Sequence, residues 1–214
     1  GSNFGDTVTE STGNNIIRTG GGDDSIVALS TNTGSDTFDG EGDFDTLTFA
    51  ATSTALTINL NLSQITGLGT DSYLNMERIV GGSGSDIVST TAANLFANTM
   101  QFDLGSGTDR ITLSSAGTVG TDASTFATLF DNVERLDFLN GNTSGGNMVI
   151  DGTDVFDITG TSKNLRLDIT SAFGLTVNAG TGYNLSIDNS NIAFTRYNFL
   201  VSGVQTAQLD VYVT

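Results

Sequence analysis

The chain has 214 residues, of which 24 are acidic and 7 are basic, so its formal net charge is −17 at pH 7. Such a surface repels nucleic acid and anionic membranes, which excludes both as expected partners. Cys and His are absent, which removes disulfides, the usual zinc sites and His-based catalysis. No apolar run has the length of a membrane span, so no membrane insertion is expected.

The first 48 residues contain five nonapeptides that follow the pattern G-G-x-G-x-D-x-U-x, in which U is a large apolar residue. Each unit has an acidic or amide residue in its sixth place and an apolar residue in its eighth. These pairs are Asp6 and Val8, Asn15 and Ile17, Asp24 and Ile26, Asp36 and Phe38, and Asp45 and Leu47. Flexible Gly/Ser loops would not keep acidic and apolar residues at fixed places in successive nonapeptides. The pattern therefore predicts tight turns that alternate with short strands.

Two further copies stand alone in the middle of the chain, and a degenerate one follows later. Residues 81–89 carry Asp86 and Val88, and residues 104–112 carry Asp109 and Ile111. The degenerate copy at 149–157 has Asp154 in the sixth place and Phe156 in the eighth. We expect the eighth residue of every copy to point into the core.

These nonapeptides resemble the RTX family of calcium-binding repeats. The resemblance implies a parallel β-roll with two nonapeptides per coil and with calcium between loops that stack on the same side. It pairs Asp6 with Asp24, Asn15 with Asp36, and Asp24 with Asp45. The cofactor that it implies is Ca²⁺, with several ions bound.

Elementary chemistry agrees with this resemblance. Calcium takes six to eight oxygens from carboxylates and carbonyls, and glycine allows a loop to turn its carbonyls inward. Without the ion the stacked carboxylates would repel one another, so folding is expected to be coupled to metal binding. The expected metal-binding residues are Asp6, Asn15, Gly20, Gly22, Asp24, Gly34, Asp36, Gly40, Gly42, Asp43, Asp45, Gly82, Gly84, Asp86, Gly105, Gly107, Asp109 and Asp154.

Apolar spacing predicts the elements between the repeats. Leu56, Ile58, Leu60 and Leu62 alternate as in a half-buried strand. Residues 73–80 predict a strand that leads into the loop at 81–89, with Glu77 and Arg78 as surface residues. In residues 124–133, apolar side chains recur with helical spacing, which predicts one amphipathic helix that covers the sheet. These residues are Phe126, Leu129, Phe130 and Val133.

The C-terminal part predicts short strands about every ten residues, separated by Gly, Asn and Asp turns. Their apolar residues are Leu165/Leu167/Ile169, Leu175/Val177, Leu185/Ile187, Ile192/Phe194, Phe199/Val201 and Leu209/Val211/Val213. Residues 132–170 are also similar to a segment near the C-terminal ends of giant bacterial RTX surface proteins. The similarity rests on the runs 134–137 and 154–157, and it implies surface display and adhesion.

Together these features predict an all-β fold. Residues 1–120 are expected to form an RTX-like β-roll or β-solenoid, and residues 121–214 a β-rich region that continues or caps it as a solenoid or sandwich. A soft boundary is expected within 115–125.

The expected function is that of a non-enzymatic, calcium-dependent structural or adhesive module of a secreted bacterial surface protein, either an adhesin or a surface-layer protein. Besides calcium, its expected partners are copies of itself in a lattice or filament, or a cell-surface glycan or peptide. One alternative is a calcium-dependent module that binds a peptide or glycan. Another is a polysaccharide-acting enzyme that uses carboxylate pairs such as Asp23/Asp24 or Asp43/Asp45. The enzyme is disfavoured because these carboxylates already have places in the loops.

Overall fold

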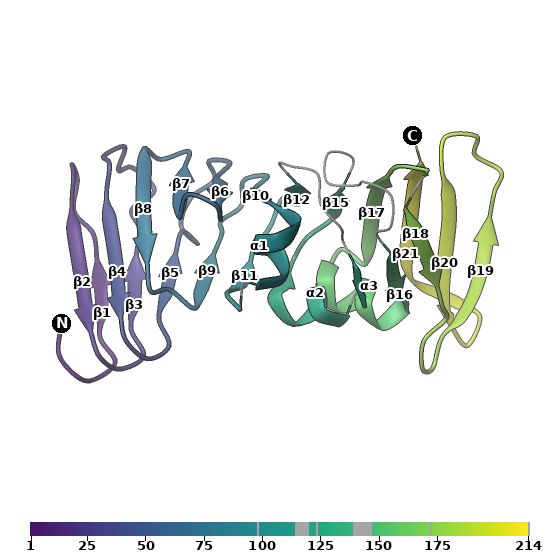
Figure 1. Cartoon of the computed structure of the whole chain (residues 1–214), viewed down its shortest axis with the longest axis horizontal. Helices are drawn as coiled ribbons and strands as arrows, with labels where there is room; N and C mark the ends of the chain where they lie inside the picture. Colours follow the sequence, from purple (N-terminus) through teal and green to yellow (C-terminus); the bar gives the residue numbers. More distant parts are fainter. Residues whose placement is uncertain (98, 114–119, 123, 139–146, 172, 214) are drawn as a thin grey trace. The chain divides into compact units, whose positions relative to one another are not determined.

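The computed structural model describes the chain except for residues 98, 114–119, 123, 139–146, 172 and 214 (Figure 1). It is mostly β-structure, with largely parallel sheets. The chain divides into two compact units. The first unit is Gly1–Ser89 with Asn98–Asp109, and the second is Thr90–Ala97 with Arg110–Thr214. The boundary expected within 115–125 lies largely outside the described residues.

The first unit has two sheets, and successive strands in its repeat region alternate between them (Figure 1). The first sheet is parallel and contains, in order, β1 (Thr7–Thr9), β3 (Ser25–Val27), β5 (Thr46–Thr48), β9 (Arg78–Val80) and β11 (Gln101–Asp103). The second contains β2 (Ile16–Gly20), β4 (Thr37–Glu41), β8 (Thr70–Leu74), β7 (Gln64–Thr66), β6 (Thr57–Asn59) and β10 (Ile87–Thr90). In this second sheet β7 is antiparallel to both neighbours, and the other pairs are parallel.

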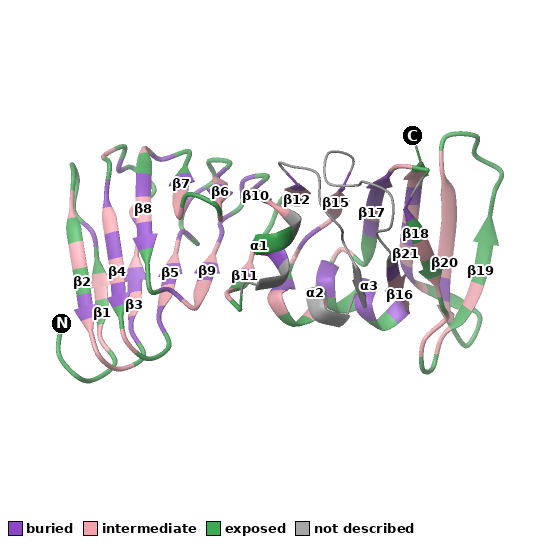
Figure 2. Ribbon diagram, in the orientation of Figure 1, coloured by how far each residue is buried: buried purple, intermediate pink, exposed green. Residues whose placement is uncertain are grey.

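The eighth residue of the repeat points into the core of the first unit, as predicted. Ile26, Phe38, Leu47 and Val88 are all buried. Buried positions lie along strands of this unit such as β4 and β8 (Figure 2). Their burial removes apolar surface from water at about 25 cal/mol per Å², which is the main source of stability for such short strands. Val8 and Ile17 are only half-buried, because β1 and β2 are the edge strands of their sheets.

Two strand predictions in this unit were wrong in extent. The alternating run that begins at Leu56 forms only the three-residue β6, and Leu62 is 63% exposed. The chain turns there, with Ser63 in the left-handed region at φ 50°. The strand predicted over 73–80 is two strands, β8 and β9, in different sheets, because Asn75 at φ 49° reverses the path between them.

The second unit also has two sheets. In the larger one, β12 (Arg110–Leu113), β15 (Arg135–Asp137), β17 (Asn164–Ile169) and β21 (Val204–Val213) run parallel, and β20 (Thr195–Val201) and β19 (Asn184–Asp188) follow as antiparallel neighbours. The smaller sheet is parallel and contains β13 (Gly120–Asp122), β16 (Asn147–Ile150) and β18 (Gly174–Val177). The remaining elements are α1 (Ala92–Ala97), α2 (Ser124–Leu129), β14 (Phe130–Asp131) and α3 (Gly152–Thr159).

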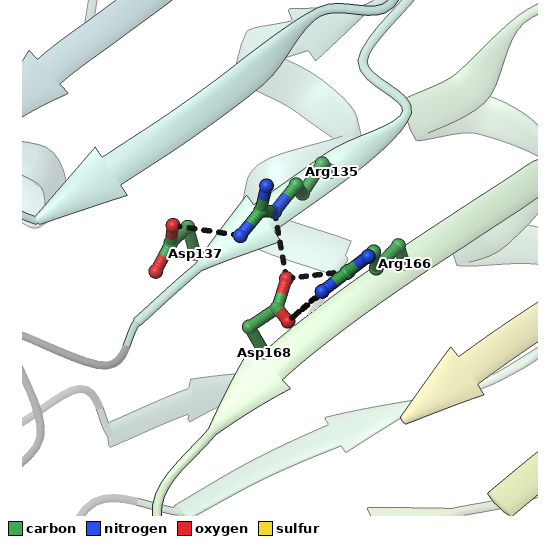
Figure 3. A network of polar contacts seen from close by, with 4 residues as sticks. All are labelled: Arg135, Asp137, Arg166 and Asp168. Carbon is green, nitrogen blue, oxygen red and sulfur yellow. Dashed lines mark hydrogen bonds and ion pairs between the residues drawn. The ribbon is translucent and has the colours of Figure 1, made fainter. Parts of the chain in front are cut away.

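Charged residues on the larger sheet of this unit neutralise one another across strands (Figure 3). The side chain of Asp168 is only 4% exposed and accepts hydrogen bonds from Arg135 Nε at 2.7 Å and from Arg166 Nη2 at 2.7 Å. Arg135 also donates to Asp137 at 3.0 Å. Arg196 and Asp210 form another such pair on β20 and β21. Carboxylates on this sheet therefore obtain their counter-charge from arginine.

Several predictions for the second unit need correction. The helix expected over 124–133 ends at Leu129, because Phe130 and Asp131 form the short strand β14, and Asn132 follows at φ 58°. α1 and α3 were not predicted. Of the separate strands expected at 192–194 and 199–201, only the second lies in a strand, the longer β20, whereas residues 192–194 precede β20 and Ile192 is fully exposed.

The degenerate repeat at 149–157 does not form a loop and strand. Asp151 is the N-cap of α3, and Asp154 completes a capping box in which its Oδ2 accepts a hydrogen bond from Asp151 N at 2.8 Å. Phe156, which was expected in the core, is 39% exposed. Asp154 therefore leaves the set of proposed metal ligands, because its carboxylate serves a helix N-terminus.

Candidate metal-binding loops

The repeat loops stack so that the side chain of a sixth residue accepts a hydrogen bond from the backbone N–H of the sixth residue in the preceding loop of the stack. Asp6 N donates to Asp24 Oδ1 at 2.7 Å, and Asp24 N donates to Asp45 Oδ1 at 2.9 Å. In the loops before the second sheet, Asn15 N donates to Asp36 Oδ1 at 2.6 Å. The three pairs that the resemblance implied are therefore in direct contact.

Two acidic residues that the sequence reading did not place in this ladder extend it. Asp36 N donates to Asp71 Oδ1 at 2.9 Å, and Asp45 N donates to Glu77 Oε2 at 2.8 Å. The prediction that Glu77 is a surface residue on a strand was wrong, because it lies before β9 and closes the ladder. Each of these acids stands two residues before a buried apolar residue, Tyr73 or Ile79. This spacing equals that between the sixth and eighth residues of the repeat. It was therefore a sequence signal from which the place of both acids in the ladder could have been predicted.

The isolated copies at 81–89 and 104–112 form the same arrangement. Leu56 N donates to Asp86 Oδ1 at 2.8 Å, and Asp86 N donates to Asp109 Oδ1 at 2.6 Å. Asp86 and Asp109 are completely buried. Burial raises the pKa of Asp86.

Glycine allows neighbouring loops to approach this closely. A Cβ at most of the predicted glycines would overlap the backbone of the adjacent loop, within 3.0 Å. These glycines are Gly20, Gly22, Gly34, Gly40, Gly82, Gly84, Gly105 and Gly107. Gly42 is the exception, since a Cβ there would meet nothing within 4 Å.

Two aspartates beneath these loops have an oxygen with no hydrogen-bond partner. Asp24 is 3% exposed and Asp45 is 1% exposed, and the Oδ2 atom of each is buried and unpaired. Burial, together with the negative charges of Asp24 and Glu77, raises the pKa of Asp45 to about 6. A buried carboxylate without counter-charge is unfavourable, so these two oxygens suit a cation.

In the loop at 10–15, carbonyl oxygens accept hydrogen bonds from a side chain of the same loop. Asn15 Nδ2 donates to the carbonyl oxygens of Ser11 at 2.7 Å and Gly13 at 2.6 Å, and lies 3.2 Å from Asp36 Oδ1. Asn32 Nδ2 donates to Asp36 Oδ2 at 2.9 Å. Two carbonyls and a carboxylate thus converge on a positively polarised group. The side-chain amide of Asn15 therefore occupies a position in which a bound cation would have these same three oxygens as neighbours.

Near the loop at 10–15, the acidic residues Glu10, Asp36 and Asp71 lie close enough to affect one another's charge. Glu10 is 6% exposed, and its Oε2 is buried and unpaired, whereas Oε1 accepts a hydrogen bond from Leu29 N at 2.6 Å. Burial raises the pKa of Glu10. Burial and the charges of Asp36 and Glu10 raise the pKa of Asp71 to about 7. Neither Glu10 nor Asp71 was predicted, because neither occupies the sixth place of a recognised repeat.

The other predicted aspartates lie nearer to solvent. Asp6 accepts hydrogen bonds from the backbone and hydroxyl of Ser2, which lower its pKa. Asp43 is exposed and its Oδ2 accepts a hydrogen bond from Gly22 N at 2.9 Å. Both residues lie at the ends or edges of the stacked loops and cross-link them.

In the described part of the chain, no three Asp or Glu side chains come together as a metal-binding group. Any ion would therefore take much of its coordination from loop carbonyls. None of the described helices has the length and apolar character needed to cross a membrane. No family model matches the chain, and no curated protein matches it in sequence.

Proposed function

We propose that the chain is a calcium-dependent structural and adhesive module of a secreted bacterial surface protein, with no enzymatic role, and that its first unit is a β-roll. The observation that carries the proposal is the pair of buried, unpaired Oδ2 atoms of Asp24 and Asp45 beneath stacked glycine turns. A fold that buries such carboxylates is stabilised when a cation neutralises them.

The chemistry of the site favours calcium. Its available ligands are carboxylate and carbonyl oxygens, and the chain contains no His or Cys that would favour zinc or another transition metal. The residues that would hold an ion are Asp24 and Asp45, together with carbonyls of the loops at 19–24 and 40–45. The loop at 10–15 supports this interpretation, because its oxygens surround the Asn15 amide in the same way.

The adhesive role is supported by three features of the chain. The resemblance of the repeats to the RTX family points to secreted proteins that fold when they meet calcium. The similarity of residues 132–170 to segments of surface-displayed proteins points in the same direction. The acidic residues of the repeat loops are engaged in contacts between loops, which favours a scaffold over a reactive site.

The experiment is a calcium titration of the metal-stripped chain, followed by calorimetry and by circular dichroism. We expect heat of binding and a gain of β-structure with Ca²⁺, and a weaker response with Mg²⁺. The double variant Asp24→Asn/Asp45→Asn should lose most of the heat and should depend less on calcium for folding. Its control is Asp188→Asn, which removes an exposed carboxylate in the second unit. A wild-type chain that is folded in chelator and takes up no calcium would refute the proposal.

A further inference from the structure

A groove in the second unit is lined by none of the residues of the proposed metal loops. Its volume is about 560 Å³, and its walls come from α2, β14, α3 and the segment after α3. It is lined by Ala127, Asp131, Phe156, Asp157, Gly160, Thr161 and Lys163. The volume falls in the range of roughly 300–1,000 Å³ that is typical of small-molecule sites.

An aromatic ring is exposed at this groove although the same helix buries its other apolar residues. On α3, Val155 and Ile158 are fully buried, whereas Phe156 is 39% exposed. Lys163 Nζ lies 5.0 Å from the centre of the Phe156 ring. The ring is thus held beside a cation and is available to a ligand from the groove.

The backbone around the groove is held in an unfavourable conformation. Lys163 at φ 55° and Asn132 at φ 58° both lie in the left-handed region, which costs a side-chain-bearing residue free energy. Gly160 has φ 53° and ψ −113°, a combination that lies outside the left-handed helical region and that glycine can adopt, and a Cβ there would overlap Asn132 Oδ1. Strain of this kind persists where the surrounding structure requires it, and it concentrates at binding sites.

The polar groups of the groove are mainly hydrogen-bond acceptors. Asp131 and Asp157 contribute carboxylates, and Lys163 contributes one ammonium group, so their charges sum to −1. Asn132 N donates to Asp131 Oδ1 at 2.8 Å, which fixes that carboxylate at the wall. An anionic ligand would meet this local charge and the −17 charge of the whole chain.

We propose that this groove binds a neutral pyranose unit of a glycan. The apolar C–H face of a pyranose packs on an aromatic ring such as Phe156, and adjacent hydroxyls donate to the Asp131 and Asp157 carboxylates. Lys163 and Thr161 supply donors to the ring or glycosidic oxygens. The inference deepens the adhesive function proposed above, because it names the class of ligand, but it requires no metal at the groove.

The test is saturation-transfer NMR on the full chain with three neutral disaccharides, namely cellobiose, maltose and lactose, and with digalacturonate as the acidic comparison. We expect transfer to at least one neutral disaccharide and none to digalacturonate. Phe156→Ala and Asp157→Asn should each weaken binding at least tenfold. Phe4→Ala, which removes a 78% exposed ring in the first unit, should leave binding unchanged.

A second variant separates binding from folding. Lys163→Asn places a residue that tolerates the left-handed conformation at φ 55°, so the melting temperature should stay the same or rise while affinity falls at least threefold. Failure of all three neutral sugars to bind the folded wild type, or unchanged binding by Phe156→Ala, would overturn the inference. Sugar binding that persists in a chain with no response to calcium would contradict the calcium proposal alone.

Discussion

At the scale of single residues, the identity of the sixth repeat position decides the electrostatics of its loop. With Asn at position 15, the loop supplies its own donor, and the amide contacts the carbonyls of Ser11 and Gly13. With Asp at positions 24 and 45, one carboxylate oxygen binds the neighbouring loop and the other is buried without a partner. At positions 24 and 45 an Asp therefore leaves a buried oxygen that the Asn at position 15 does not, whereas Asp36 in the same repeat place has both oxygens bonded by Asn15 and Asn32.

The glycines of these loops allow a matched test at the same scale. Gly22 has φ 97°, and a Cβ there would lie 2.6 Å from the carbonyl carbon of Phe4, whereas Gly42 has open space around it. We expect Gly22→Ala to lower the free energy of unfolding by about 2 kcal/mol or more, because it combines strain with a backbone clash. Gly42→Ala should change it by less than about 0.5 kcal/mol. Urea denaturation in calcium measures both, and equal losses would show that the loops do not stack this closely.

At the scale of elements, the sequence predicted the repeat strands because their signal is short and periodic. The spacing from the sixth to the eighth residue identified β3, β4, β5 and β10. The pairing of Asp24 with Asp45 was implied by the resemblance to RTX repeats, and the two residues are in contact. The spacing failed where a single left-handed residue redirects the chain, as at Ser63 and Asn75. Ser gives no sign of that conformation, and Asn permits it without requiring it. The spacing also failed at Asp154, because Gly-Thr-Asp fits both a repeat loop and a helix N-terminus.

The candidate site was predicted only in part for a related reason. The repeat pattern selects residues by position, so it found Asp24 and Asp45 but could not tell that Asn15 satisfies its own loop. Glu10, Asp71 and Glu77 contribute carboxylates from outside the sixth place of the recognised repeats, and Glu10 and Asp71 are buried. Their roles follow from which loops become neighbours, and this depends on the lengths of the connections between them.

The stacked carboxylates predict an unusual pH dependence for the metal-free chain. Burial raises the pKa of Asp71 to about 7 and that of Asp45 to about 6, from a usual value of 3.8. The folded state therefore holds these protons more tightly than the unfolded state does. This stabilisation is complete below about pH 4 and is lost as the pH rises through 6 and 7.

In chelator we expect the folded fraction, followed by circular dichroism, to increase as the pH falls from 8 to 5. Asp71→Asn keeps an acceptor for Asp36 N and removes the charge, so it should stabilise the metal-free chain at pH 8 by on the order of 2–4 kcal/mol and have little effect at pH 4. Glu41→Gln, which removes an exposed carboxylate, is the control. A stability that rises with pH in chelator would contradict this account.

At the scale of the whole molecule, the two units balance their charge by different means. The first unit holds the repeat loops and only two basic residues, Arg18 and Arg78. The second unit holds the other five basic residues of the chain, and its Asp168, Asp137 and Asp210 carboxylates are paired with arginine. Arginines of the second unit thus supply counter-charge to these three carboxylates, whereas the two arginines of the first unit pair with Asp39 and Asp103 and not with the repeat-loop residues Asp24 and Asp45.

This difference predicts that calcium protects the two units unequally. In hydrogen exchange of the full chain, removing calcium should increase exchange by at least tenfold in β3, β4 and β5, whose loops carry the unpaired carboxylates. Exchange in β15, β17 and β21 should change by less than threefold, because arginines already neutralise Asp168 and Asp210. Raising the salt concentration gives the opposite test. Screening should weaken the partly exposed Arg196–Asp210 pair of the second unit and should not replace calcium in the first unit. Equal exchange of both units on calcium removal would show that the metal stabilises the chain in some way other than through these loops.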